Sequence, residues 1–460
     1  MGEGRTWQRP RDAFKKWMLR PEYVKNYTQV FNPLTRDVVR MFEEKCLAEM
    51  ATNSSSQPPS YLVENLDEMM HYFALDCILK FFFQKRFYPF SEELRGKLAQ
   101  KENGPDTSTR DSLTDRNGNP IQLTPVDDAT GPIFENPEQA KIFVHGVTNI
   151  FRSCLTFFFV PIQLIKWLRM KTWLRFREHF TDLYSIVERL IGEKMEMLQE
   201  DKDAHRKDIS IVTQLLALDD LTPAEIASSV VDIMGGAVDT TATALQWAFY
   251  LLAKNPDKQE ILFDEVCKVV GDSKEITWSH LERMPYLKAT VKELLRLYPV
   301  IPLIGRIVSC PITVNGVNYP KGTKFNIVSY AAGRSEEIFQ DSEKFIPERW
   351  IRNKSEVKEG AQATSQENAQ NDAEDSESQS KCPFSSSSIN KYGTMPFGLG
   401  VRSCIGRRIA QLELYLFIAN LVRRFKIKPP NGDDFSVGDK WQILLLPDSP
   451  VKVRLESRFL

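Results

Sequence analysis

One short segment near the C-terminus constrains this chain more than any other. Residues 396–408 read PFGLGVRSCIGRR, a glycine-rich turn that brings Cys404 to the start of a helix with periodic apolar residues. A thiolate there is stabilised by the positive end of the helix dipole and by backbone N–H groups. Gly398 and Gly400 have no Cβ, so the backbone can closely approach a flat macrocycle. The segment therefore predicts a cysteine that binds the metal of a planar cofactor, with Arg402 placed to pair with a cofactor carboxylate.

Two simpler interpretations of residues 396–408 are an ordinary buried cysteine at a turn and a nucleotide-binding loop. The dinucleotide pattern fails because position 403 is serine rather than glycine, and no Walker lysine follows. The pattern Phe-Gly-x-Gly-x-Arg-x-Cys-x-Gly resembles the haem-binding signature of the cytochromes P450. This resemblance implies haem b (iron protoporphyrin IX) as the cofactor and Cys404 as the iron ligand. It also implies cofactor-binding roles for Phe397, Gly398, Arg402 and Gly406.

Two further motifs of that family lie upstream in the expected order. Residues 292–296 read KELLR and match its Glu-x-x-Arg motif, and residues 345–350 read FIPERW and match its Pro-Glu-Arg-aromatic motif. An i, i+3 Glu–Arg pair is by itself usually a surface salt bridge that contributes a few tenths of a kcal/mol. The resemblance implies instead that Glu293, Arg296 and Arg349 form a buried structural network.

A long helix is predicted from Pro223 to about Lys254, with Thr222 as its N-cap. Glycines at 235 and 236 cost about 1 kcal/mol each relative to alanine, which suggests a local distortion. Residues 236–241 read GAVDTT and resemble the family's oxygen-activation motif, although Gly-Ala replaces the commoner Ala-Gly. An acid beside an alcohol can relay protons, so Asp239 and Thr240 are the predicted catalytic residues. The alternative is a flexed helix with polar residues facing solvent.

Three other residues are predicted from the resemblance to contact the haem propionates. Trp7 and Arg11 stand four residues apart, as in the family's Trp-x-x-x-Arg helix, and Arg306 follows the Glu-x-x-Arg helix. The simpler interpretation of the first pair is that tryptophan and arginine pack together on one helix face.

Four basic residues indicate the electron donor. Arg407 and Arg408 directly follow Cys-Ile-Gly, while Lys288 and Lys292 share a helix face at i, i+4. They can equally be solvated surface cations. The segments that contain these residues, 404–410 and 287–299, resemble the mitochondrial class of the family, as do residues 171–173 (KTW). This resemblance implies an acidic, adrenodoxin-like [2Fe–2S] ferredoxin and its NADPH reductase as partners.

Length alone suggests two or three domains, but the resemblance implies one large cytochrome P450 domain over residues 1–460, mainly α-helical with a small β region. Lysine and arginine number 60 against 61 acidic residues, so no global charge argues for nucleic acid. Prolines 21 and 33 predict helix boundaries, helices are expected at 256–270 and 284–298, and the runs 312–317 and 324–328 predict a hairpin. Residues 100–137 are predicted to be a polar loop insertion, and residues 354–388 a low-complexity acidic and serine-rich insertion.

No apolar run in the sequence is long enough to cross a membrane. Residues 157–169 combine apolar side chains with Lys, Arg and Trp, which suits a peripheral contact with a membrane interface; the edge of a core helix is the alternative. The resemblance implies a mitochondrial location on the matrix side of the inner membrane. In the family, a targeting peptide and further β and helical elements precede the Trp-x-x-x-Arg helix. We therefore expect an N-terminally incomplete P450 fold that lacks those elements and the targeting peptide.

These features together predict a haem-thiolate monooxygenase that hydroxylates a lipophilic, steroid- or sterol-like substrate with O2. A thiolate-haem isomerase or lyase is a first alternative, although the retained Asp239 and Thr240 argue against it. A non-catalytic haem- or lipid-binding P450 remnant is the second.

Overall fold

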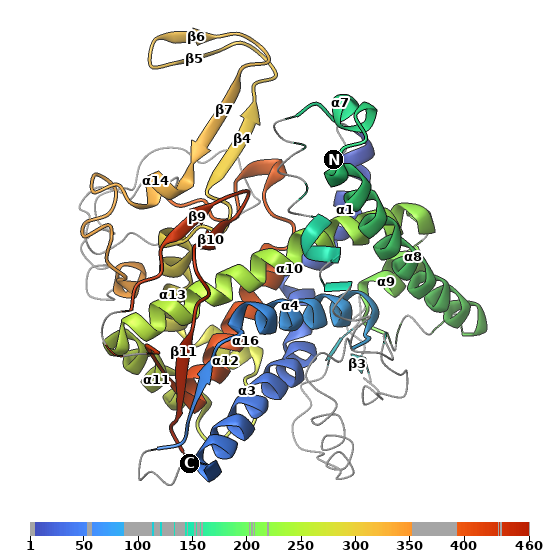
Figure 1. The fold of residues 1–460 in the computed structure, drawn as a ribbon. Helices are drawn as coiled ribbons and strands as arrows, with labels where there is room; N and C mark the ends of the chain where they lie inside the picture. The colour runs from blue at the N-terminus through green and yellow to red at the C-terminus, as the bar shows by residue number, and fades with distance from the viewer. Residues whose placement is uncertain are drawn as a thin grey trace, which may run out of the picture.

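The computed structural model contains a helical body and several small sheets (Figure 1). The residues that it describes are 5–52, 58–86, 113–114, 120–121, 133, 143–144, 146–150, 153, 157, 160–201, 203, 206, 208–218, 220–351, 393–430, 432 and 435–459. Most of the two predicted insertions, 100–137 and 354–388, lies outside these residues, although β2 (Leu113–Thr114) pairs with β3 (Pro120–Ile121).

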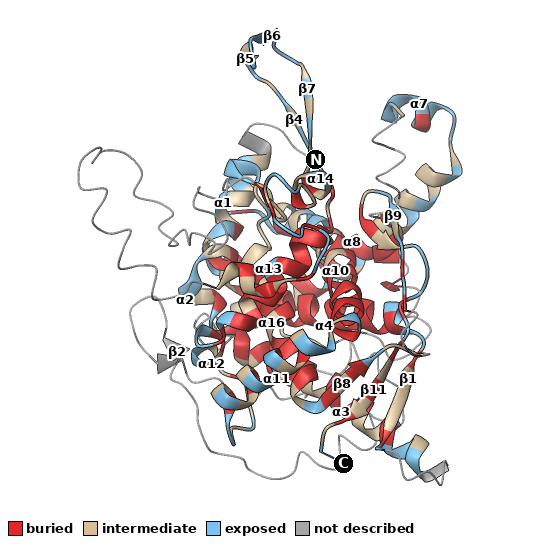
Figure 2. Cartoon of the chain, turned by 90° about the vertical axis from the view of Figure 1, so that its left-hand side faces the viewer, coloured by how far each residue is buried: buried red, intermediate tan, exposed pale blue. Residues whose placement is uncertain are grey.

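The helix α10 (Pro223–Lys254) runs through the middle of the body. Its N-terminus has the predicted capping box, in which Thr222 accepts a hydrogen bond from the backbone N–H of Glu225 and the Glu225 side chain accepts one from the backbone N–H of Thr222. Its C-terminal half is buried on almost every side because α4 (Leu66–Phe83), α13 (Pro285–Leu297) and α16 (Arg407–Arg424) pack around it. Figure 2 shows this buried core. A helix that is apolar all round is stable only in such a position.

The remaining helices surround this core. They are α1 (Arg5–Leu19), α2 (Pro21–Val24), α3 (Tyr27–Thr52), α7 (Ile162–Trp167), α8 (Lys171–Glu200), α9 (Ile211–Leu218), α11 (Pro256–Val270), α12 (Trp278–Glu282) and α14 (Ser329–Gly333). No helix among the described residues is both long and apolar enough to span a membrane.

The largest described sheet has three antiparallel strands in the order β1 (Ser60–Val63), β11 (Val453–Ser457) and β8 (Phe425–Lys428). A two-stranded sheet joins β9 (Asp439–Trp441) to β10 (Leu445–Pro447). The mainly α fold with a small β region is therefore as predicted.

The predicted hairpin between 312–317 and 324–328 is wrong in its pairing. β5 (Ile312–Val314) pairs with β6 (Val317–Tyr319) in a tight hairpin, whereas β7 (Lys324–Val328) pairs with β4 (Leu303–Ile307). Asn315 and Gly316 have φ angles of 49° and 79°, which suit the two turn residues of a short hairpin. The two pairs extend from the helical body as a finger (Figures 1 and 2).

One predicted helix boundary and one predicted helix distortion are wrong. Pro21 begins α2, as expected, but Pro33 lies inside α3. Burial of Phe31, Leu34 and neighbouring side chains on both sides of Pro33 offsets the local cost of the proline. The local distortion expected at Gly235 and Gly236 is absent, because α10 is a continuous helix through both residues.

Candidate functional site

A cavity of about 470 Å³ lies between α10 and the loop that carries Cys404. Its volume falls within the range of small-molecule sites, roughly 300–1,000 Å³. The wall from α10 includes Gly236, Ala237 and Thr240, and a Cβ on Gly236 would meet no atom within 4 Å. Gly236 therefore leaves space in the cavity rather than breaking the helix.

Cys404 lies on the opposite wall of this cavity, just before α16 begins. Its backbone N–H donates to the carbonyl oxygen of Phe397 at 2.7 Å, which closes the loop. Gly398 and Gly400 have φ angles of 68° and 71°, so both glycines are required by the backbone conformation. A Cβ on Gly406 would lie 3.8 Å from Cys404 Sγ, a normal contact distance. The thiol is thus surrounded by backbone and open toward the cavity.

The electrostatic surroundings of Cys404 act in two directions. Burial raises the pKa of the thiol, while the N–H groups of Gly406 and Arg407 and the charges of Arg11 and Arg407 lower it. The side chain is nevertheless accessible, because it faces the hollow of the cavity. A metal cation would add the positive charge that a coordinated thiolate requires. The loop, the open wall at Gly236 and the exposed thiol fit a flat metal macrocycle.

Two of the four predicted propionate contacts line the cavity. Arg306 and Arg402 both do so, and a Cβ on Gly398 would lie 3.8 Å from Arg306 Nη2. Trp7 and Arg11 instead line a separate cleft against the same loop. The Arg402 guanidinium lies 3.5 Å from the centre of the Trp7 ring, and Arg11 Nη2 donates to the Ser403 carbonyl at 2.6 Å. Trp7 and Arg11 therefore brace the cysteine loop in this structure.

Asp239 and Thr240 face different sides of α10. Thr240 lines the cavity, and its hydroxyl donates to the Gly236 carbonyl at 2.8 Å. Asp239 is buried and accepts a hydrogen bond from His71 Nε2 at 3.0 Å. The predicted acid and alcohol are adjacent in sequence, but only the alcohol reaches the cavity.

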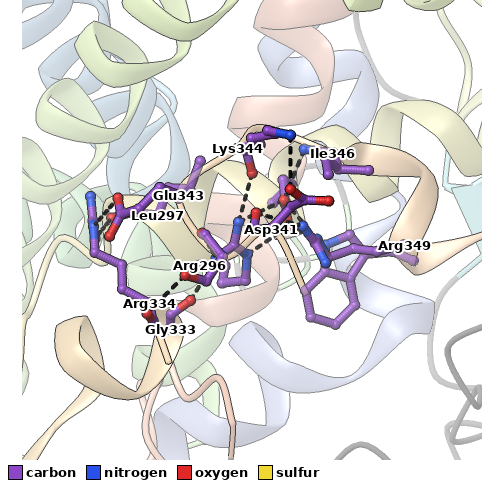
Figure 3. Close-up of polar contacts among 12 residues, drawn as sticks. Arg296, Leu297, Gly333, Arg334, Asp341, Glu343, Lys344, Ile346 and Arg349 are labelled. Carbon is purple, nitrogen blue, oxygen red and sulfur yellow. Dashed lines mark hydrogen bonds and ion pairs between the residues drawn. The ribbon is translucent and has the colours of Figure 1, made fainter. Parts of the chain in front are cut away.

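The predicted network of Glu293, Arg296 and Arg349 is present and buried. Arg296 binds Glu293 with Nε and Nη2, at 2.9 and 2.8 Å, and Arg349 Nε binds the same carboxylate at 2.9 Å. The remaining Arg296 donors bind the carbonyls of Gly333, Ser342 and Lys344, which Figure 3 shows in part. The network ties α13 to the segment that follows α14.

The predicted basic residues fall into two groups. Arg407 and Arg408 line a cleft of about 780 Å³ together with Lys15 and Lys16 of α1, which sequence reasoning had missed. Lys288 and Lys292 do not line it but lie on α13, which packs against α16.

Sequence reasoning also missed two buried acid–base groups. Glu413 of α16 lines the cavity and accepts a hydrogen bond from Thr241 Oγ1 at 3.0 Å; burial raises its pKa to about 8. His71 of α4 binds Asp239. No local motif could have indicated either residue, because Glu413 lies 172 positions from Thr241 and His71 lies 168 positions from Asp239 in the sequence.

This architecture, with its buried helix, small sheets and cysteine-lined cavity, is that of a haem monooxygenase. The chain belongs to the cytochrome P450 family, because the family model for Cytochrome P450 matches residues 1–455. It is an oxidoreductase of the monooxygenase type that binds haem b. The predicted family, enzyme class and cofactor are thereby confirmed.

Curated relatives agree with the predicted class. The chain is 29% identical to sterol 26-hydroxylase, mitochondrial, of Homo sapiens. The alignment spans 464 residues and covers 99% of this chain and 72% of the relative. It is 27% identical to cholesterol side-chain cleavage enzyme, mitochondrial, of Oncorhynchus mykiss, over 70% of this chain and 55% of the relative. It is 25% identical to 1,25-dihydroxyvitamin D(3) 24-hydroxylase, mitochondrial, of Rattus norvegicus, over 92% of this chain and 65% of the relative.

Proposed function

We propose that this protein hydroxylates a sterol-like substrate in mitochondria, with O2 and with electrons from a [2Fe–2S] ferredoxin. The observation that carries the proposal is the cavity with Cys404 on one wall and Thr240 on the other. Haem bound there would supply oxygen activation, which a thiolate ligand such as Cys404 would favour.

The residues around the cavity divide the work. Cys404 would ligate the iron, and the loop from Phe397 to Gly406 would hold the sulfur in place. Arg306 and Arg402 offer guanidinium groups to the propionates, as charge-assisted hydrogen bonds favour. Trp7 and Arg11 support Arg402 and Ser403 from behind the loop.

Residues of α10 supply the protons that the reaction consumes. Thr240 presents its hydroxyl to the cavity, where it can pass a proton by hydrogen bonding, and Asp239 is the nearby acid. Isomerisation or lyase chemistry on a peroxide needs no such external protons, so this pair favours monooxygenation.

The substrate class follows from the relatives and the cavity. All three relatives described above are named for sterols or a vitamin D compound. The cavity walls include apolar side chains, among them Val300, Ile301 and Ile304. Such walls suit a lipophilic molecule.

Basic residues on the cysteine side favour an acidic electron carrier. Arg407, Arg408, Lys15 and Lys16 line one cleft beside the cysteine loop, so a negatively charged ferredoxin would dock close to the thiolate. Lys288 and Lys292 add positive charge on α13, outside this cleft.

The helix α7 supports a peripheral contact with a membrane. Leu164, Trp167 and Leu168 are exposed, Trp167 by 78%. Exposed leucine and tryptophan beside Lys166 suit the interface of a bilayer, and a lipophilic substrate could enter from there. Such a contact agrees with a location at the mitochondrial inner membrane, on its matrix side.

Reconstitution with NADPH, ferredoxin reductase and a [2Fe–2S] ferredoxin tests the proposal. With cholesterol or 1,25-dihydroxyvitamin D(3) as probe, we expect a product one oxygen atom heavier, formed only when all components are present. Product formed without NADPH would indicate isomerase or lyase chemistry. Sterol binding without oxygen uptake would indicate a non-catalytic binder. Either result would contradict the proposal.

A further inference from the structure

Two stacked aromatic rings lie directly behind the wall of the haem cavity. Ala244 of α10 and Leu295 of α13 line that cavity together with Cys404. Trp247 follows Ala244 by three residues, and Tyr298 follows Leu295 by three, so each ring lies about one helical turn beyond the wall. The two rings are nearly parallel, at 15°, with their centres 3.9 Å apart. A buried indole and a phenol are therefore placed next to the cofactor site.

The stack continues from Tyr298 to the surface of the protein. The Arg334 guanidinium contacts two phenols, because it lies 5.2 Å from the ring centre of Tyr298 and 3.8 Å from that of Tyr330. The Tyr330 ring in turn lies 4.9 Å from the Trp441 ring. Such distances are those of direct contacts between π systems and of a cation over a ring. The aromatic series therefore consists of Trp247, Tyr298, Tyr330 and Trp441.

The aromatic series runs from the core to solvent. Trp247 is 0% exposed, whereas Trp441 is 46% exposed. Trp247 belongs to α10, Tyr298 caps α13, Tyr330 belongs to α14 and Trp441 ends β9. The elements α13, α14 and β9 lie on the same side of the body in Figure 1. Core packing explains the inner rings equally well, so the redox behaviour of the outer rings separates the two interpretations.

The outer phenol has a partner that can take its proton. The Tyr330 hydroxyl donates a hydrogen bond to the Asp439 carboxylate. An oxidised phenol is a strong acid, so an adjacent carboxylate makes the loss of an electron from Tyr330 easier. The positive charge of Arg334 would oppose that loss, but Glu343 lies 3.2 Å from Arg334 Nε and offsets it. The Trp441 indole, at the surface, can release its own proton to water.

We propose that the aromatic series carries single electrons inward, from Trp441 to the haem cavity, and so protects the haem when peroxide reacts there. Peroxide arises whenever reduced oxygen leaves the site without hydroxylating a substrate. Radical chemistry of this kind resides in the cofactor, and the protein's part is to direct it away from competing reactions. This protection goes beyond the hydroxylation proposed above and needs only the haem that the family binds.

The electron balance is closed by a soluble thiol. Trp441 gives one electron to its neighbour in the series, its N–H proton goes to water, and a neutral indolyl radical remains. A thiol such as glutathione then returns one hydrogen atom to that radical and becomes a thiyl radical. Over two such rounds, one hydrogen peroxide and two thiols give two waters and one disulfide. No covalent bond of the protein breaks in the cycle.

Spin trapping followed by peptide mass spectrometry tests the proposal in the full, haem-loaded protein. Hydrogen peroxide is added with the trap 2-methyl-2-nitrosopropane, in the absence of thiol, ferredoxin and sterol. We expect the trap adduct on Trp441. Trp167 is 78% exposed against 46% for Trp441, so a radical distributed by exposure alone would mark Trp167 first. Labelling of Trp167 equal to or above that of Trp441 would overturn the proposal.

The variant Tyr330→Phe interrupts the series while Trp441 stays in place. Phenylalanine keeps the ring but resists oxidation, so the Trp441 adduct should fall to the level of a sample without peroxide. Bleaching of the haem Soret band by peroxide should be at least about twofold faster than in wild type, because the oxidising equivalent stays at the cofactor. The matched control Tyr319→Phe changes a tyrosine in the finger, packed on Phe325, and should match wild type in both measurements.

A Trp441 adduct that persists in Tyr330→Phe would overturn the proposal, and so would bleaching at the wild-type rate. If Tyr330→Phe does not hold haem, Trp441→Phe removes only the outermost ring. Its bleaching should also be faster, and an unchanged rate would overturn the proposal. Neither ferredoxin nor sterol enters these measurements. Failure of sterol hydroxylation therefore leaves their outcome unaffected, and a missing Trp441 adduct leaves the proposed hydroxylation intact.

Discussion

Replacing Glu293 with glutamine should be among the most destabilising single changes in this protein. Its Oε1 accepts three hydrogen bonds, from Arg296 Nη2, Arg349 Nε and the backbone N–H of Ile346, and its Oε2 accepts two, from Arg296 Nε and Trp350 Nε1. The side chain is 0% exposed, as is that of Arg296.

The magnitude follows from what glutamine cannot do. Its amide NH2 replaces one carboxylate oxygen, so at least two donors lose their acceptor, at about 1–3 kcal/mol each. Two arginine charges also lose their counter-ion, and breaking a buried ion pair costs about 3–5 kcal/mol. These contributions overlap, so we expect a loss of about 4 kcal/mol in the free energy of unfolding. That is a large part of a typical total of 5–15 kcal/mol, and about a thousandfold in the equilibrium constant.

Urea unfolding of the haem-loaded protein, followed by far-UV circular dichroism, measures this loss. The matched control is Glu343→Gln, the same substitution in an exposed ion pair with Arg334 at 3.2 Å. The Glu343 side chain is 69% exposed, so its variant should lose less than about 1 kcal/mol. Equal losses in the two variants would refute the view that Glu293 anchors a buried network.

Three further outcomes are expected. Thr240→Val should lower the rate of product formation by roughly 10²-fold while haem remains bound, because the cavity loses its hydroxyl; liquid chromatography of product against NADPH consumed checks this. The double change Arg407→Glu and Arg408→Glu should slow association with a [2Fe–2S] ferredoxin by tenfold or more at low salt in stopped-flow measurements, and the difference should shrink as salt is added. Burial alone would lower the pKa of His71, but the hydrogen bonds and charges of Asp239 and Asp67 raise it to about 10 against an ordinary 6.5. This shift stabilises the fold fully below pH 6.5 and less as the pH rises toward 10. The unfolding free energy of wild type minus that of His71→Gln should therefore fall by roughly 3–5 kcal/mol over that range in urea titrations, and a constant difference would contradict the ion pair.

Much of the site was predictable because its residues lie in short motifs. The cysteine loop, the capping box at Thr222 and the Glu293–Arg296 pair depend on spacings of a few residues, which local geometry fixes. The pairing of β7 with β4 was not predictable, since β5 and β6 form their own hairpin between them.

Contacts between distant elements were equally hidden from the sequence. The bond between His71 and Asp239 depends on the packing of α4 against α10. The side of α10 that each residue faces also depends on that packing, so the sequence could place Asp239 and Thr240 together but could not show that they face different sides. Pro33 was misjudged for the same reason, because burial around α3 outweighs its local preference.

The central claim is that Cys404 ligates the haem iron, and the carbon monoxide difference spectrum after dithionite reduction tests it most directly. The wild type should show the red-shifted Soret band of a thiolate ligand. The matched control Cys310→Ser changes another exposed cysteine and should keep that band, whereas Cys404→Ser should lose it while far-UV circular dichroism still shows a helical protein. A thiolate band that persists in Cys404→Ser, or one that is absent from the wild type, would contradict the account.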